Sequence, residues 1–249
     1  MPARRRDIDF KPWVDGLPFK SRFDYSYDGT MRSFEDSPQR LGLEHIDILF
    51  IHEADVFTHG TEMQKVYFRQ AMDGCYRALI ELREQGRVKA IGVGVNNWEV
   101  MLDFMRAGDF DTLLVAGRYT LLEQDALDEL LPLRERRGTA IVIGGGFNGG
   151  ILATGAVPGA KWNYAPAPAP IMEKVKRIEA VCARHKVPLA AAALQFLLAH
   201  PAVASHVPGT RTAAQMDQNI ALASHPIPMS FWQDLKREGL LRQDAPVPI

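Results

Sequence analysis

Short apolar runs in this sequence end in residues whose side chains could do chemistry. His52 and Glu53 come directly after the run IDILFI, which covers residues 46–51. An imidazole in this position could act as a general acid or orient a substrate carbonyl group. The alternative for His52 is a hydrogen-bonded histidine at the rim of the fold. Glu53 could bind substrate hydroxyl groups, or it could be a solvated loop acid.

Two amides and an aromatic side chain follow the next two apolar runs. Asn96 and Asn97 end the run KAIGVGV, and Tyr119 follows the run over 111–116. A carboxamide offers both a hydrogen-bond donor and an acceptor to a ligand. The alternative for the amides is a helix cap, because Asn is favoured there. Tyr119 could stack on a ligand or pack at the rim.

A glycine-rich segment, GGGFNGG, covers residues 144–150. Glycines allow backbone N–H groups to approach a ligand closely. The segment is not the GxGxxG fingerprint of dinucleotide-binding folds, because the spacing and the ribose-binding acid are both absent.

A phosphate-binding pattern begins at Gly209 and continues into a helix predicted over 212–223. Amides at the start of a helix favour an anionic group, and Arg211 could add a charge-assisted contact. Gln215 and Asn219 are four residues apart and so share one face of that helix. The alternative is a capped surface helix with polar decoration.

The composition is that of an ordinary globular protein. Of the 249 residues, 47% are apolar and 24% are charged, and the net charge is -1. This balance argues against a nucleic-acid or membrane-surface partner. Cys75 and Cys182 have no metal-ligand spacing, so we expect no metal site and two reduced, buried thiols. No apolar run approaches the ~18 residues that span a bilayer, and no secretory signal is present, which predicts a cytoplasmic protein.

Strands and helices alternate along the chain. The apolar runs predict strands over 46–51, 88–95, 111–116, 139–143 and 202–207. Helices are predicted over 30–41, 63–85, 97–107, 123–137, 171–186, 188–199 and 212–223. Strands that are apolar on both faces and separated by helices are typical of a parallel sheet, so the fold class is α/β. In such folds the site lies at the carboxyl ends of the strands. The Ala-Pro repeat over 165–170 predicts an extended loop.

Five fragments, in this order, resemble the later strands and loops of the aldo-keto reductases. They are SFEDSPQRLGLEHIDILFIHEAD, LREQGRVKAIGVGVNNW, LLVAGRYTLLEQ, GGGFNGGILATG and VPGTRTAAQMDQNI. Within the family, the variants IGVGVNNW and AGRYTLLEQ resemble the D-threo-aldose 1-dehydrogenase branch (L-fucose or galactose dehydrogenases), which is close to the pyridoxal 4-dehydrogenases. The resemblance extends over nearly the whole chain.

This resemblance implies a (β/α)₈ TIM barrel in which the five predicted strands are the fourth to the eighth. The chain 1–249 would then be a single, incomplete barrel domain without the first three βα units. The family's catalytic group is an Asp, a Tyr, a Lys and a His, and only His52 is carried over. The other three belong to the second and third units. Asp24, Tyr25 and Tyr27 stand at the wrong place in this order and are expected to pack in a loop.

The resemblance also implies NAD or NADP as the cofactor. Asn96 would bind the nicotinamide carboxamide. Gly144 stands where many members carry an aromatic residue near the nicotinamide, so Tyr119 or Phe147 would compensate for it. The glycine-rich segment would border the pyrophosphate. The rest of the nucleotide would be held by Gly209, Arg211, Thr212, Gln215 and Asn219.

Two functions remain open at this point. The first is an enzyme that oxidises an aldose at C1 to the lactone, with pyridoxal or another small aldehyde as the alternative substrate. The second is a remnant that binds nucleotide without catalysis. An incomplete barrel exposes two strand edges, which would favour domain swapping or a homo-oligomer. The choice between NAD and NADP stays open, because a single Arg does not prove a 2′-phosphate site.

Overall fold

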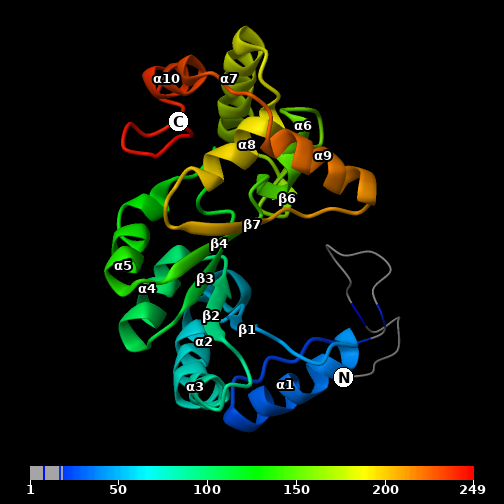
Figure 1. Cartoon of the computed structure of the whole chain (residues 1–249), viewed down its shortest axis with the longest axis vertical. Helices are drawn as coiled ribbons and strands as arrows, with labels where there is room; N and C mark the ends of the chain where they lie inside the picture. The colour runs from blue at the N-terminus through cyan, green and yellow to red at the C-terminus, as the bar shows by residue number, and fades with distance from the viewer. Residues whose placement is uncertain (1–7, 9–16, 18) are drawn as a thin grey trace.

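A sheet of five parallel strands forms the centre of the molecule (Figure 1). The computed structural model of the chain describes residues 8, 17 and 19–249. The strand order is β1-β2-β3-β4-β7, with bounds Ile48–His52, Ala90–Val95, Thr112–Ala116, Ala140–Gly144 and Val203–Val207. All five predicted strands and the α/β class are therefore confirmed. That three further βα units precede them, and that the chain is one domain, stay predictions.

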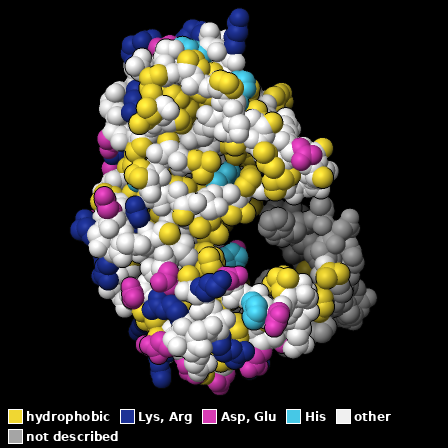
Figure 2. All heavy atoms as spheres, in the orientation of Figure 1, with side chains coloured by type: hydrophobic (Ala, Val, Ile, Leu, Met, Phe, Trp, Pro, Cys, Tyr) yellow, Lys and Arg dark blue, Asp and Glu magenta, His cyan; other side chains and the backbone are white. Residues whose placement is uncertain are grey.

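Helices lie around the outer side of the curved sheet (Figure 1). The α-helices are α1 (Tyr27–Leu41), α2 (Val56–Gln70), α3 (Arg77–Glu84), α4 (Trp98–Ala107), α5 (Leu130–Arg137), α6 (Ile151–Thr154), α7 (Ala169–His185), α8 (Leu189–Leu198), α9 (Ala213–Ala223) and α10 (Met229–Arg237). Short π- or 3-10 turns are η2 (Ala71–Tyr76), η3 (Asp125–Leu127) and η4 (Asn148–Gly150). Figure 2 shows that the visible face is hollowed between α1 and α9 and that hydrophobic side chains gather along the hollow.

The structure corrects several predicted boundaries. The single helix predicted over 63–85 begins earlier, at Val56, and continues through the π-helical turn η2 into α3. The Ala-Pro repeat is not one extended loop. It contributes strand β6 (Ala165–Pro166), which pairs with β5 (Lys161–Trp162), and helix α7 begins within it. Helix α10 was not predicted at all.

The parallel register places the carboxyl ends of the strands at one edge of the sheet. His52 of β1 lies opposite Gly94 of β2, and Gly144 of β4 lies opposite both Ala116 of β3 and Val207 of β7. The polar loops that leave these strand ends therefore begin side by side, as the sequence predicted.

Other expectations concern the cysteines and membrane spans. Cys75 and Cys182 are both unpaired and buried, as expected. No helix in the described part of the chain is long and apolar enough to cross a membrane. Among the same residues, no group of three or more His, Cys, Asp or Glu side chains is arranged to hold a metal ion.

The segment before α1 is docked on the π-helical turn through a close backbone contact. The N–H of Cys75 donates a hydrogen bond of 2.8 Å to the carbonyl oxygen of Tyr25. A Cβ atom on Gly74 would lie 2.7 Å from that same oxygen and 2.8 Å from the amide nitrogen of Tyr27. Only a glycine therefore permits this contact, which buries the Tyr25 ring.

We expect Gly74→Ala to lower the free energy of unfolding by about 1–3 kcal/mol, because the added methyl group meets backbone atoms that cannot move aside. Gly94→Ala is the matched control, because its Cβ would find only ordinary contacts of 3.5 Å or more. Urea denaturation of both variants measures the difference. Equal stability of the two variants would contradict the close contact.

Candidate active site

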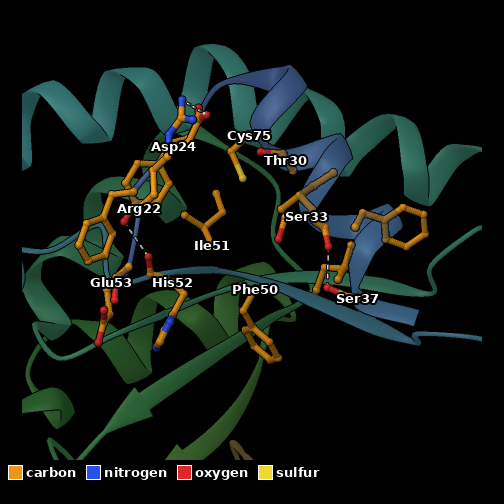
Figure 3. Close-up of a pocket in the computed structure, with 16 residues that line it drawn as sticks. Arg22, Asp24, Thr30, Ser33, Ser37, Phe50, Ile51, His52, Glu53 and Cys75 are labelled. Carbon is orange, nitrogen blue, oxygen red and sulfur yellow. Dashed lines mark hydrogen bonds and ion pairs between the residues drawn. The ribbon is translucent and has the colours of Figure 1, made fainter. Parts of the chain in front are cut away.

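His52 lies at the carboxyl end of β1, the edge at which the polar loops gather. Its side chain is exposed and points to the same side of the strand as Phe50, while Ile51 points toward α1 (Figure 3). The backbone around it is fixed from both sides. The Tyr25 hydroxyl donates a 2.7 Å hydrogen bond to the His52 carbonyl oxygen, and the Glu53 N–H donates to the Gly94 carbonyl oxygen at 3.1 Å. The imidazole is therefore displayed from a rigid strand end.

The residues just before α1 have structural partners, as the sequence predicted. Asp24 accepts a 2.5 Å hydrogen bond from the Ser26 hydroxyl and pairs with Arg22, and this environment lowers its pKa. Burial, followed by the nearby Glu53 and other acidic groups, raises the pKa of Tyr25 above its ordinary value. The Tyr27 hydroxyl donates to Glu81. These groups hold the segment in place.

A buried carboxylate positions Asn96 at the end of β2. Asp55 is fully buried, and its Oδ2 accepts hydrogen bonds from the backbone N–H of Asn96 at 2.6 Å and from its side-chain Nδ2 at 3.3 Å. Its Oδ1 accepts from the N–H of Thr58 at 2.9 Å, which caps α2. No local pattern in the sequence predicts this role for Asp55. Because Nδ2 faces Asp55, the Oδ1 of Asn96 is the atom available to a ligand's donor.

A second carboxylate, that of the partly buried Glu123, joins four loops. Glu123 pairs with Arg118 at 2.8 Å and accepts hydrogen bonds from Asn148 and from the indole Nε1 of Trp162, each at 3.0 Å. The Arg118 Nε also donates to the carbonyl oxygen of Asn96 at 2.8 Å. Glu123 therefore links the loops that follow β2, β3 and β4 to the β5–β6 hairpin.

A cavity of about 380 Å³ lies beside the amino-terminal end of α9. Its lining includes five residues predicted to hold the cofactor: Phe147, Gly209, Arg211, Gln215 and Asn219. Arg211 is the one charged side chain among the described residues that line it. The glycine-rich segment and the last loop therefore line one cavity, and that they hold a cofactor stays a prediction.

The start of α9 is capped as the sequence indicated. Thr212 occupies the position before the helix, and its Oγ1 accepts a 3.2 Å hydrogen bond from the N–H of Gln215. The side-chain Oε1 of Gln215 accepts a 2.8 Å hydrogen bond from the N–H of Arg211. The loop and the first turn are therefore fixed relative to each other at the cavity wall.

The glycine-rich segment serves the packing of the protein itself as well as the cavity. Gly149 adopts a positive φ of 72°, and a Cβ atom there would lie 2.9 Å from the carbonyl oxygen of Lys161. Gly144 ends β4 and accepts a hydrogen bond of 2.8 Å from the N–H of Gly117 through its carbonyl oxygen. Neither the 380 Å³ cavity nor the smaller cavity at Asn96 is lined by Gly144.

The expectation that Tyr119 stacks on a cofactor requires correction. Its side chain is fully buried, with ring centroids 5.1 Å from Phe196 and 5.4 Å from His200. Strand β3 ends at Ala116, Gly117 has a positive φ of 68°, and Tyr119 packs in the core against Phe196 and His200. Phe147 is the aromatic residue that reaches the 380 Å³ cavity.

Comparison with known proteins agrees with this arrangement. A family model described as "Aldo/keto reductase family" matches residues 16–238. The chain is 45% identical over 229 residues to a pyridoxal 4-dehydrogenase of Microbacterium luteolum. It is 35% identical over 223 residues to a D-threo-aldose 1-dehydrogenase of a Pseudomonas species. These matches cover 92% and 89% of this chain but 67% and 65% of the relatives, so the chain spans about two thirds of their length.

A solved structure shares the fold. The holo form of an aldo-keto reductase from Bacillus halodurans superposes with a TM-score of 0.67 at 22% identity. The superposition covers 91% of this chain and 70% of that chain. The arrangement of the parallel sheet and its helices is therefore that of an aldo-keto reductase.

One titratable group behind the glycine-rich segment makes the stability of this region depend on pH. The His206 ring on β7 lies 6.3 Å from the Phe147 ring, and its buried Nε2 has no hydrogen-bond partner in the described part of the chain. Burial lowers the pKa of His206 to about 4. Its ordinary value is about 6.5, so the unfolded chain binds the proton first as pH falls.

We therefore expect the chain to lose stability as pH falls from about 6.5 toward 4, and His206→Gln to show a smaller loss. His45→Gln, at an exposed histidine, is the control and should follow the unchanged chain. Urea midpoints at pH 7 and pH 4.5 measure this. An equal loss in the unchanged chain and in His206→Gln would show that His206 does not titrate as described.

Proposed function

Because the chain belongs to the aldo/keto reductase family, we propose that it is an oxidoreductase that moves a hydride between a nicotinamide dinucleotide and a small carbonyl compound. The observation that carries this proposal is the 380 Å³ cavity, where residues from two distant loops meet at the start of α9. The named dehydrogenases among its relatives support the same reaction class.

The cavity suits the phosphate end of a dinucleotide. The amides of the first turn of α9 and the Arg211 side chain present positive charge to it. Gly209 has no atom within 4 Å of its Cβ position, so a ligand can approach its backbone. Gln215 and Asn219 line the same wall. Their amide groups can donate hydrogen bonds to ribose hydroxyls or accept hydrogen bonds from them. Phe147 offers an apolar surface at the opposite loop.

Asn96 and His52 are assigned to the reacting end. When bound, the nicotinamide ring would take up or release the hydride. The Oδ1 of Asn96 would accept a hydrogen bond from the carboxamide of that ring, because Asp55 holds the amide nitrogen on its other side. The His52 imidazole would donate a hydrogen bond to the substrate oxygen and so orient it. Tyr25 acts only through His52, as a positioning residue.

Two substrate classes are compatible with the family. The sequence motifs favour oxidation of an aldose at C1 to the lactone, as in the D-threo-aldose 1-dehydrogenase relative. The higher identity to a pyridoxal 4-dehydrogenase, 45% against 35%, favours a small aldehyde such as pyridoxal. We propose that the substrate belongs to one of these two classes, and that NAD or NADP is the cofactor.

The test of this function is the appearance of reduced nicotinamide absorbance with NAD or NADP and pyridoxal, L-fucose or D-arabinose. Turnover of any pair supports the oxidoreductase. Quenching of tryptophan fluorescence by nucleotide without turnover would instead indicate a chain that binds nucleotide only. If the chain shows no quenching by either nucleotide and no turnover of any substrate, the proposal is overturned.

We expect Arg211→Ala to weaken nucleotide binding by about 1–3 kcal/mol, because a charge-assisted contact to phosphate is lost. The control is Arg136→Ala, at an exposed position on α5 that does not line the cavity. Fluorescence titration of both variants with NAD and NADP gives the two affinities. Unchanged affinity in Arg211→Ala would remove Arg211 from the site.

A further inference from the structure

The β5–β6 hairpin presents a strained tyrosine at its tip. Asn163 and Tyr164 form its two-residue turn, with φ values of 48° and 64°. A turn with both central residues left-handed accepts Asn readily but normally has Gly second. A tyrosine in that conformation costs on the order of 1–2 kcal/mol. Such strain is found at ligand clamps and other functional positions.

The base of the hairpin is firmly anchored, so the direction of the tip is fixed. The Trp162 indole donates its 3.0 Å hydrogen bond to the partly buried Glu123 carboxylate. Behind it, the Gly149 backbone approaches Lys161 more closely than any side chain would allow. The N–H of Ala167 closes the base by donating to Ala160 at 2.9 Å. Tyr164 nevertheless remains 57% exposed.

A second exposed aromatic residue stands beside Tyr164. Phe57, in the first turn of α2, is 52% exposed, and its ring centroid lies 6.2 Å from that of Tyr164 at an interplanar angle of 41°. The Phe57 N–H donates a 3.0 Å hydrogen bond to the Oδ1 of Asn97, which fixes the start of α2 against the end of β2. The two rings, which we call the aromatic wall, join loops that follow different strands.

A small cavity of about 160 Å³ lies at the foot of the aromatic wall. Its lining includes three amides, those of Asn96, Asn148 and Asn163, together with Tyr164, and its described lining holds no charged side chain. Asn148 is 2% exposed. Its Nδ2 donates to the Gly117 carbonyl and to Glu123, whereas its buried Oδ1 has no partner in the described part of the chain. A polar cavity with an unused acceptor suits a ligand with an O–H or N–H donor.

We propose that the aromatic wall of Phe57 and Tyr164 stacks on the flat ring of an aromatic or heteroaromatic aldehyde or alcohol, with a donor substituent of the ring bonded to the Asn148 Oδ1 below and Asn96 left to the cofactor. This inference rests on the proposed function and names its substrate class. Stacking between aromatic rings adds about 0.5–1.5 kcal/mol beyond burial. A sugar carries a hydroxyl on nearly every carbon and needs more polar partners than three amides supply. The wall therefore selects the planar ring over the aldose.

Binding of a chosen probe to the full chain tests this. Pyridoxine, a heteroaromatic alcohol without a reactive aldehyde, is the probe, and L-fucose is the sugar for comparison. We expect the unchanged chain to bind pyridoxine more tightly than L-fucose by calorimetry. Tyr164→Leu and Phe57→Leu should each weaken pyridoxine binding about three- to tenfold. Phe19→Leu, at a similarly exposed ring (55%), should not weaken it.

Tyr164→Gly separates binding from folding. Glycine relieves the left-handed strain, so its thermal midpoint should equal or exceed that of the unchanged chain, while pyridoxine binding falls. A fall in both would mean that the ring is structural and would overturn the inference. The inference would also be overturned if the unchanged chain bound L-fucose more tightly than pyridoxine, or if Tyr164→Leu and Phe57→Leu bound pyridoxine as tightly as the unchanged chain.

Nucleotide titration of the same samples separates this inference from the proposed function. If NAD or NADP still quenches tryptophan fluorescence and is reduced by turnover of a substrate, but pyridoxine does not bind, the aromatic wall has been wrongly assigned and the oxidoreductase proposal stands. If nucleotide quenching is absent from the unchanged chain, the proposed function fails, and with it the inference that rests on it.

Discussion

The parallel register of five short strands is the constraint on which the remaining features depend. Parallel strands return through a helix, so every loop that follows a strand begins at the same edge of the sheet. His52, Asn96, the glycine-rich segment and the Gly209–Arg211 loop all follow strand ends at one edge of the sheet for this reason alone. Their sequence separation has no bearing on the distance between them. The strands need only be apolar on both faces, which leaves the loops free to carry function.

Two carboxylates, the buried Asp55 and the partly buried Glu123, hold these loops in fixed positions. Asp55 and Glu123 each accept hydrogen bonds from elements that lie far apart in the chain. A buried carboxylate is costly unless its lone pairs are satisfied, so each one holds its partners tightly in place. Asp55 thereby sets the direction of the Asn96 amide, and Glu123 sets the base of the β5–β6 hairpin. The positions of the ligand-facing groups are therefore well defined, because the carboxylates that hold them lie below the surface while the groups themselves are accessible to a ligand.

The sequence was sufficient to predict the five strands and which loops follow them, and the reasons why other predictions failed are physical. An apolar run of about five residues between helices identifies a strand even at the edges of the sheet, where β1 and β7 are largely exposed. The resemblance assigned His52 and the α9 loop to their positions in the fold. Asp55 and Glu123 could not be found, because their roles are contacts across the fold that leave no local pattern. The prediction that Tyr119 stacks on a cofactor was wrong because the chain leaves the strand at Gly117, where φ is positive, and the alternation of faces along a strand does not continue to Tyr119. The β5–β6 hairpin was hidden by its Ala-Pro repeat, which is typical of an extended loop.

The two halves of the candidate site are stabilised in opposite ways. The hairpin that carries Tyr164 is anchored at its base strongly enough to hold a left-handed tyrosine, so its shape is set before a substrate arrives. Helix α9, alone among the helices of the described chain, contains no buried residue. It is held by its Thr212 cap and by bonds such as those from Gln195 to the carbonyls of Leu222 and His225 at 3.0 and 2.7 Å. Few buried contacts mean a low local cost of opening, and a ligand that binds only the closed form stabilises it by mass action. Nucleotide bound against α9 would therefore order its own wall of the site, whereas the aromatic wall is ready-made.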